Sequence, residues 1–466
     1  MLGLPGVNDA VVTRGDGKLS RRRSHAAIAV AAMVVAGLLG TTTAGAAASG
    51  YSTVVQSDIG DQLRAVPGLT VVSEEPSPVS GYRLFALDYL QPVDHHDPAG
   101  GFFKQRVQLL HRSENRPTVL YTNGYEVPAQ VSLSEPAQML DANQLVVGQR
   151  FFTGSRPEPA DWSKLTIWQA ASDHHRLISA LRRVYSGRWI GSGIAKGGAA
   201  AVYYRRFYPD DVAGVVSYGA PDNVDDDEDS RYNAFLENVG TPKCRQGLKD
   251  IQRAALRKRD EIVPRYEAWA AANGFTFDQV IGSADRAFEL IVMHLRYAFW
   301  QFYLTEDCVR IPPATASADQ IWDFLDEIVS WQTPVDQTLL ARSAWFYQAV
   351  NQMGFPSVRA PYLAGLLHYP DIHEAVNLLP PSLRPTHDPY AMEDIDQWVR
   401  TRSSRMLFVN GGNDPSPAEH FVPGQRDSYA FTAPGASYRT GRIATLPDHD
   451  KEIATAAVRR WAGVGR

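Results

Sequence analysis

The 466-residue chain carries 51 acidic and 46 basic side chains, for a formal net charge of −5, and 44% of its residues are hydrophobic. Its length allows a large buried core, in one big domain with an insertion or in two domains. An acidic chain without a basic run is a poor candidate for a nucleic-acid partner. Two cysteines without a nearby cluster of histidines do not make a zinc site, and we expect neither a metal nor a cofactor.

The first 48 residues have the pattern of an export signal. Arg21 to Arg23 precede an apolar segment of about 14 residues, Ala26 to Leu39, and A-x-A sites ending at Ala46 or Ala48 follow. The apolar segment is short for a membrane span, and an uncleaved anchor is the alternative. No later segment is apolar enough to cross a bilayer, so we expect a secreted, extracellular protein with no membrane contact after cleavage. The signal carries five Lys/Arg and two Asp/Glu, and its removal takes the formal charge from −5 to −8.

The next residues predict strands and then an alternation of strands and helices. Tyr82–Leu90 and Phe102–His111 have strand character. Two shorter apolar runs, Thr118–Tyr121 and Leu145–Val147, end in small-residue turns, as strands buried in a mostly parallel sheet do. Apolar residues recur at helical spacing from Trp162 to Tyr185, so a helix is expected there.

A nucleophile-elbow pattern lies between a predicted strand and a predicted helix. Gly193-Ile194-Ala195-Lys196-Gly197 matches the motif G-x-S-x-G except at its centre, which is Ala195. The motif needs small residues because its central residue sits on a strained turn from strand to helix. The strand residues Trp189-Ile190 precede the motif and the helical run Ala199–Tyr208 follows it, so the context indicates an α/β-hydrolase core.

The same turn would supply an oxyanion hole. A helix leaves its first backbone N–H groups without intrahelical partners, so we expect the amide of Lys196 as one donor and the loop near Gly124 as the source of another. Phosphate binding is the competing interpretation. It is disfavoured because Gly191, Gly193 and Gly197 miss the dinucleotide fingerprint by one residue, and because the lysine does not follow the glycine as a P-loop requires.

The middle of the chain predicts a helical cap. From about Val224 to Pro385 strand signals nearly vanish, and long amphipathic stretches such as Cys244–Asn273 dominate. Five acids, Asp225 to Asp229, open this segment and are interpreted as a solvated hinge in preference to a binding patch. The cap, 224–385, would divide an α/β core into 49–223 and 386–466.

The chain has two cysteines, Cys244 and Cys308. Export to an oxidising compartment favours a disulfide between them, and two free buried thiols are the alternative. Such a bridge is worth roughly 4 kcal/mol in the chain-entropy model.

Asp414 is the candidate triad acid. It follows the predicted strand Arg405–Asn410 in a Gly-Gly-Asn-Asp-Pro turn, where an α/β-hydrolase places its acid after the nucleophile and before the histidine. His449, ahead of the predicted last helix Lys451–Ala462, is a candidate base. An ordinary turn aspartate and a solvated histidine near a helix start are the alternatives.

Many short runs, in order along the chain, carry a family resemblance. They are Gln91-Pro92-Val93-Asp94-His95, Ser155-Arg156-Pro157, Asp161-Trp162, Leu165-Thr166-Ile167, Tyr203 to Pro209, Cys244-Arg245, Asp307-Cys308, Asn413-Asp414-Pro415 and Arg460 to Val464. The chain after its signal therefore resembles the secreted prolyl tri/tetrapeptidyl aminopeptidases of actinobacteria. The resemblance implies a serine-peptidase fold with a helical lid that admits short peptides with a free N-terminus.

The chain departs from the family pattern at its catalytic positions. The family elbow reads G-x-S-K-G-G, and Ala195 stands in place of the serine. The family histidine follows an Ala-Pro-Gly turn in an Asn-His-Gly stretch, and Tyr438 stands there in this chain. The family tends to have an acid before a basic pair where this chain has Gly148-Gln149-Arg150, so a contact to the amino terminus of a substrate would be lost.

These departures predict a secreted pseudo-peptidase that binds short peptides. A methyl group cannot attack a carbonyl, and tyrosine, with a pKa of about 10, is a poor base at neutral pH. One alternative is an active hydrolase that releases N-terminal tri- or tetrapeptides, with His449 and Asp414 activating water. Another is an engineered serine-to-alanine form, which the second loss, at Tyr438, disfavours.

Overall fold

A computed structural model describes residues 57–224 and 229–465. The predicted signal, residues 1–48, and most of the predicted acidic hinge, Asp225 to Glu228, lie outside the described residues. Within those two described ranges, no helix combines the length and the apolar character needed to cross a membrane.

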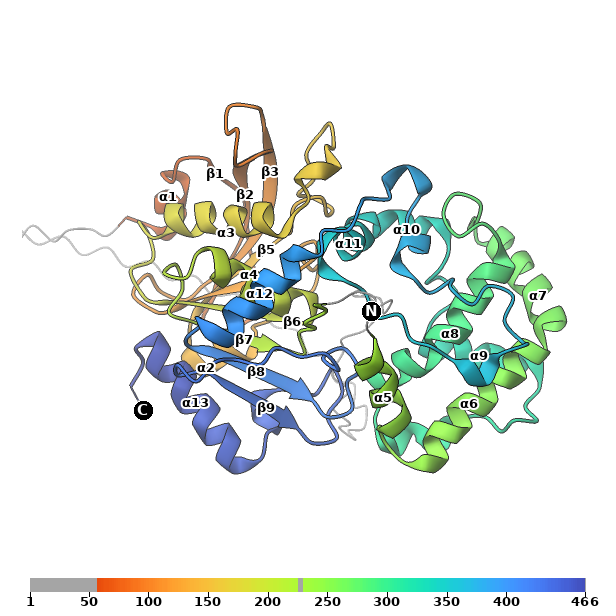
Figure 1. Ribbon diagram of the computed structural model, residues 1–466. Coiled ribbons are helices and arrows are strands. Elements are labelled where there is room, and N and C mark those ends of the chain that lie inside the picture. Colours follow the sequence, from red (N-terminus) through yellow and green to blue (C-terminus); the bar gives the residue numbers. More distant parts are fainter. Residues whose placement is uncertain (1–56, 225–228, 466) are drawn as a thin grey trace, which may run out of the picture.

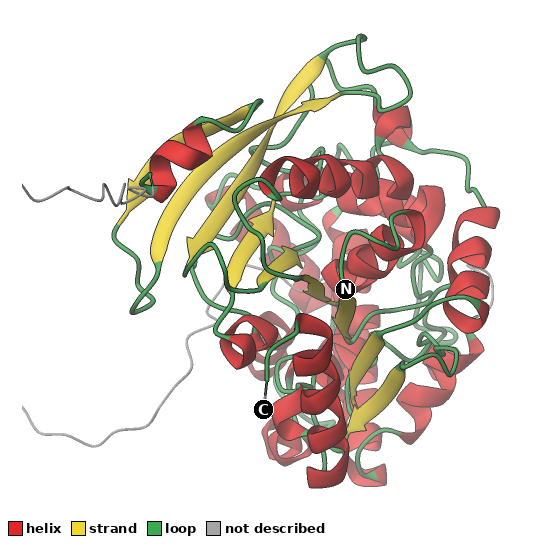
Figure 2. Ribbon diagram, turned by 90° about the vertical axis from the view of Figure 1, so that its left-hand side faces the viewer, coloured by secondary structure: helices red, strands yellow, loops and turns green. Residues whose placement is uncertain are grey.

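One sheet of nine strands forms the core of the described chain, in the order β1-β2-β3-β5-β4-β6-β7-β8-β9. The bounds are β1 (Leu69–Glu75), β2 (Arg83–Pro92), β3 (Phe102–His111), β4 (Thr118–Thr122), β5 (Asn143–Val147), β6 (Trp189–Ile194), β7 (Gly214–Tyr218), β8 (Met406–Gly411) and β9 (Tyr429–Ala433). The first four strands in this order, β1, β2, β3 and β5, pair in antiparallel fashion. From β5 onward, through β4, β6, β7 and β8 to β9, every neighbouring pair is parallel. This mostly parallel sheet, seen as a twisted layer in Figure 2, confirms the α/β-hydrolase prediction.

The strand register brings the ends of β6 and β7 level with each other, and β8 ends two residues further along. Ile194 at the end of β6 pairs with Tyr218 at the end of β7, and Tyr218 pairs with Val409 of β8. Because parallel strands end at the same edge of a sheet, Ala195 after β6 and Asp414 after β8 emerge on one edge, separated by the end of β7.

Successive residues of the central strands face two separate apolar layers. In β4, Val119 packs in one layer and Leu120 in the other, and Val216 and Val215 of β7 divide in the same way. The layer with Leu120 and Val215 contains two long helices, and the layer with Val119 and Val216 contains two others. The helices are α3 (Ile167–Leu181) and α4 (Lys196–Phe207) on the first face, α2 (Glu135–Leu140) and α13 (Asp448–Ala462) on the second, and the short α1 (Ile59–Arg64) against β1.

A helical cap is inserted between β7 and β8, and Figure 1 shows it on one side of the core. Its helices are α5 (Ser230–Asn238), α6 (Pro242–Arg257), α7 (Arg259–Ala272), α8 (Ala284–Phe302), α9 (Ala318–Ile328), α10 (Asp336–Ala341) and α11 (Ser343–Gln348), and α12 (Tyr390–Thr401) leads back to the sheet beside α4. The sequence pattern predicts one long amphipathic segment over Cys244–Asn273. The structure has two helices there, α6 and α7. They meet at Lys258, whose φ of −100° and ψ of 20° leave the helical region, so that α6 and α7 can both pack on α8.

The predicted disulfide is present. Cys244, in the first turn of α6, is bonded to Cys308 in the 3₁₀ turn Thr305–Arg310 that follows α8, with 5.4 Å between the Cα atoms. The bridge therefore ties two ends of cap elements that are 64 positions apart in sequence.

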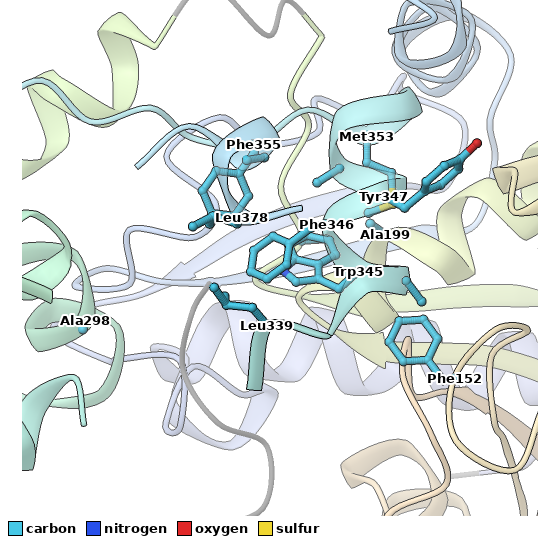
Figure 3. Close-up of a cluster of buried hydrophobic side chains, with 14 of the residues drawn as sticks. Phe152, Ala199, Ala298, Leu339, Trp345, Phe346, Tyr347, Met353, Phe355 and Leu378 are labelled. Atoms are coloured by element: carbon cyan, nitrogen blue, oxygen red, sulfur yellow. The ribbon is translucent and has the colours of Figure 1, made fainter. Parts of the chain in front are cut away.

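Aromatic side chains join the cap to the core. The Trp345 ring of α11 lies 6.3 Å from that of Tyr125 after β4, and the Tyr347 ring lies 5.3 Å from that of Trp162, measured between centroids. Figure 3 shows Trp345 and Tyr347 in a buried cluster with the core residue Phe152. The cap is thus packed through a shared apolar core.

Candidate active site

Ala195 occupies the turn between β6 and α4 in a backbone conformation that few residues adopt. Its φ is 48° and its ψ is −118°. Its N–H donates to the Tyr218 carbonyl oxygen at 2.7 Å, and its own carbonyl accepts from the Ala199 N–H at 2.8 Å. A sparsely populated conformation of this kind costs a residue with a side chain on the order of 1–3 kcal/mol. The chain thus keeps a strained strand-to-helix turn around a methyl group that is only 7% exposed.

Glycines let the loop after β4 approach this turn closely. A Cβ atom on Gly193 would lie 2.7 Å from the Thr122 carbonyl oxygen, and one on Gly124 would lie 2.7 Å from the Gly197 nitrogen. The Thr122 hydroxyl donates to the Gly197 carbonyl at 2.6 Å. Gly124, with φ of 81°, is therefore held against the first residues of α4.

Lys196 begins α4 and sends its side chain into the interior. Its Nζ donates to the Gly124 carbonyl and, at 2.5 Å, to Gln149 Oε1. Three rings lie 4.8 to 5.7 Å from it, those of Tyr125, Phe152 and Trp345. Burial lowers the pKa of Lys196 well below its ordinary value. The side chain ties the Gly124 loop to the elbow, while the amide stands at the helix start, where such donors lack intrahelical partners.

Asp414 lies in the turn after β8 and is 2% exposed. Its Oδ1 accepts from the Ser416 N–H at 2.9 Å. Its Oδ2 faces the end of β7, because a Cβ atom on Gly219 would lie 3.0 Å from that oxygen. Burial raises the pKa of Asp414 to about 7. No histidine among the described residues donates a hydrogen bond to this carboxyl group.

Tyr438 lies in the loop after β9, beside the end of a cap helix. Its N–H donates to the Gln301 carbonyl of α8 at 3.0 Å, and its ring meets that of Phe302 edge to face at 5.7 Å. Burial raises the pKa of its phenol above the ordinary value, and the neighbouring Tyr121 and Tyr125 raise it further by smaller amounts. Its hydroxyl therefore stays protonated at neutral pH and cannot serve as a general base.

The cap covers this edge of the sheet. Besides the backbone bond to Tyr438, Gln301 donates from Nε2 to Ser416 Oγ at 3.0 Å, so one residue of α8 touches both the acid loop and the Tyr438 loop. Tyr232 of α5 donates to Asn223 Oδ1 at 2.5 Å. The insertion thus closes over the carboxyl ends of β7 and β8.

His449 lies elsewhere on the surface. It is exposed on the first turn of α13, which packs on the opposite face of the sheet from α4. In the described structure no hydrogen bond joins it to Asp414. This placement agrees with a solvated histidine near a helix start.

Among the described residues, the position at the apex of the elbow is held by Ala195, whose methyl group cannot attack a carbonyl. Gly124 and Lys196 meet at the turn that holds Ala195, while Asp414 lies in the loop after β8 and Tyr438 in the loop after β9. Within 57–224 and 229–465, no three His, Cys, Asp or Glu side chains are grouped as metal ligands. Sequence reasoning missed Gln301 of α8, because nothing in a helical pattern shows which loop the helix will meet.

Comparison with known proteins places this chain in a family. The family description PS-10 peptidase S37 matches residues 53–466. A prolyl tri/tetrapeptidyl aminopeptidase from Streptomyces mobaraensis is 46% identical over 439 residues, which cover 93% of this chain and 91% of that protein. Two solved structures, VinJ and a proline iminopeptidase from Mycobacterium smegmatis, align with 84% and 80% of this chain, and with 100% and 98% of their own chains. Their identities are 11% and 12% and their TM-scores 0.37 and 0.36, so neither informs the function.

Proposed function

This chain belongs to the PS-10 peptidase S37 family, and from that premise we propose that it is a secreted pseudo-peptidase that binds short peptides without cleaving them. The observation that carries the proposal is Ala195. It stands at the apex of the elbow, with φ of 48°, where a serine-type peptidase needs its nucleophile.

The surroundings of Ala195 support loss of catalysis and retention of a binding site. Asp414 has a raised pKa and no histidine partner among the described residues, and the phenol of Tyr438 is no base at neutral pH. The elbow nevertheless has a strained backbone at Ala195, the Gly124 loop beside it and the Lys196 amide at the start of α4. The Gly124 loop and the Lys196 amide could bind a peptide carbonyl group, and the cap and the core around them are both present. A peptide-binding protein of this family would use these features.

Secretion is part of the proposal. The pattern of residues 1–48, the disulfide between Cys244 and Cys308, and the lack of a membrane-spanning helix in the described ranges all agree with an extracellular protein.

The test is a paired measurement on the purified mature protein. Tripeptidyl chromogenic amides report cleavage, and calorimetry with the tripeptide amide Ala-Ala-Pro-NH2 reports binding. We expect binding without release of the chromophore above background. Turnover by the unaltered protein would refute the pseudo-peptidase, and failure to bind any short peptide would refute the binding function.

A further inference from the structure

The chain leaves the core for the cap at Asp222, shortly after β7. Asp222 is 4% exposed. Its N–H donates to the Glu419 carbonyl oxygen at 2.9 Å, and the neighbouring Pro221 forms a β-bridge with His420. The backbone at Asp222 is therefore fixed to the core, at the point where the cap begins.

The helix α12 brings the chain back from the cap to β8, and it packs on α4 of the core (Figure 1). The carboxyl group of Asp396 in this helix is a hydrogen-bonding partner of the Asp222 carboxyl group. Both oxygens of Asp396 also accept from Arg400 Nε, at 2.7 Å each. The outgoing and the returning segments of the cap thus meet through two carboxyl groups.

This pair needs a proton to hold together. Two carboxylates cannot hydrogen-bond to each other, because each has only acceptors. No N–H or O–H donor among the described residues reaches the buried Oδ1 of Asp222. Burial, and then the hydrogen bond and the charge of Asp396, raise the pKa of Asp222 well above its ordinary value. Since Asp396 already pairs with the Arg400 guanidinium, the proton belongs on Asp222, which donates it to Asp396.

The groups around the pair leave a second charge uncompensated. The other charged or titratable side chains around Asp222 are Glu419 in the loop after β8, Arg400 of α12, Tyr203 of α4 and Tyr232 of α5. Burial raises the pKa of both tyrosines, so their phenols stay neutral. An ionised Asp222 would therefore face the carboxyl groups of Asp396 and Glu419 with one shared cation, and like charges at such a distance repel.

We infer that Asp222 and Asp396 form a proton-dependent clamp at the base of the cap, closed while they share a proton and weakened when that proton leaves. The protonated pair fastens the start of the cap to its return helix, and the ionised pair pushes them apart. Because Ala195 and Asp414 are buried, the cap has to move before a peptide can reach them, and this consequence alone rests on the proposed function.

The direction of the pH dependence follows from the raised pKa of Asp222. Its contribution to closure is complete below the ordinary pKa of 3.8 and is lost as the pH rises through the higher pKa of the closed state. Between these two limits the equilibrium constant for opening rises up to about tenfold per pH unit, because opening releases one proton.

The test is hydrogen exchange followed by mass spectrometry on the mature full chain at pH 5, 6.5 and 8, corrected for intrinsic exchange rates. The protection of α5 and α12 should fall at least about tenfold from pH 5 to pH 8. The core helix α3 should stay more protected than both at each pH. If α3 falls to the level of α5 and α12, the pair stabilises the whole fold and the clamp is refuted.

Three variants assign the effect to the pair. Asp222→Asn provides an amide that donates to Asp396 at every pH, so it should remove most of the fall, and Asp396→Asn should do the same from the other side. Asp394→Asn is the matched control on α12, because Asp394 pairs with the cation Arg206 of α4 at 2.8 Å, and it should keep the fall.

An undiminished fall in both Asp222→Asn and Asp396→Asn would overturn the inference and assign the pH dependence to another group, such as Asp414. None of these measurements uses a peptide, so the clamp and the proposed function succeed or fail separately.

Discussion

Asp414→Asn should stabilise the folded protein, by an amount that grows as the pH rises. Asp414 is 2% exposed, and burial raises its pKa from 3.8 to about 7. A carboxyl group whose pKa is higher in the folded than in the unfolded state favours folding fully below about pH 4, and this contribution is lost as the pH rises to about 7. A difference of about three pKa units corresponds to at most about 4 kcal/mol.

Asparagine keeps the shape of the side chain and the oxygen that accepts from the Ser416 N–H, but it cannot ionise. Urea unfolding followed by tryptophan fluorescence, at pH 4.5, 6 and 8, gives the free energy of unfolding of both proteins. The advantage of the variant should be small at pH 4.5 and reach a few kcal/mol at pH 8. Adding Tyr438→His to the parent should shrink this difference, because an imidazole beside Asp414 would lower its pKa.

Asp94→Asn provides a control of opposite sign. Asp94 pairs with Lys164 at 2.8 Å, and that partner lowers its pKa, so its loss should destabilise the protein by nearly the same amount at pH 4.5, 6 and 8, because all three lie above the unfolded pKa of 3.8. If the effect of Asp414→Asn does not vary with pH, or if the variant is less stable than the parent at pH 8, then Asp414 is ionised in the folded protein and other groups stabilise its charge. The view of Asp414 as an acid without its histidine would then be wrong.

Two further predictions concern stability. Reduction of the disulfide should raise the intact mass by two hydrogens. Cys308→Ser should lower the free energy of unfolding by roughly 4 kcal/mol. Two alkylatable thiols in the denatured, unreduced protein would contradict the bridge. Gly124→Ala should destabilise by more than about 1 kcal/mol, because φ is 81° and the new Cβ would lie 2.7 Å from the Gly197 nitrogen. Gly274→Ala shares a positive φ of 73° and meets nothing within 4 Å, so equal melting temperatures of the two variants would refute the steric argument.

The features set by local sterics could be predicted from the sequence. The spacing of Gly193 and Gly197 around Ala195 predicts the elbow, because only glycine allows the Thr122 loop to approach. The helical pattern from Trp162 to Tyr185 predicts a helix, although α3 begins later, at Ile167, where the Thr166 hydroxyl accepts from the Gln169 N–H at 3.2 Å.

Features that depend on long-range packing could not be predicted. The edge strand β9 is half exposed and short, so its residues carry no buried-strand pattern. The raised pKa of Asp414 depends on its burial in the folded chain, and the contact of Gln301 with Tyr438 joins residues 137 positions apart.

Restoring the two catalytic positions one at a time shows whether both have been lost. The rate of release from a tripeptidyl chromogenic amide is compared for the parent, Ala195→Ser, Tyr438→His and the double variant. Loss of either the serine or the histidine of such a triad costs about as much as loss of all of it, on the order of a millionfold, so both single variants should stay at background. Turnover is expected only in the double variant. A robust peptidase from Ala195→Ser alone would show that a base is already present and that Tyr438 does not stand in its place. The chain would then be a disabled enzyme and not a natural pseudo-peptidase.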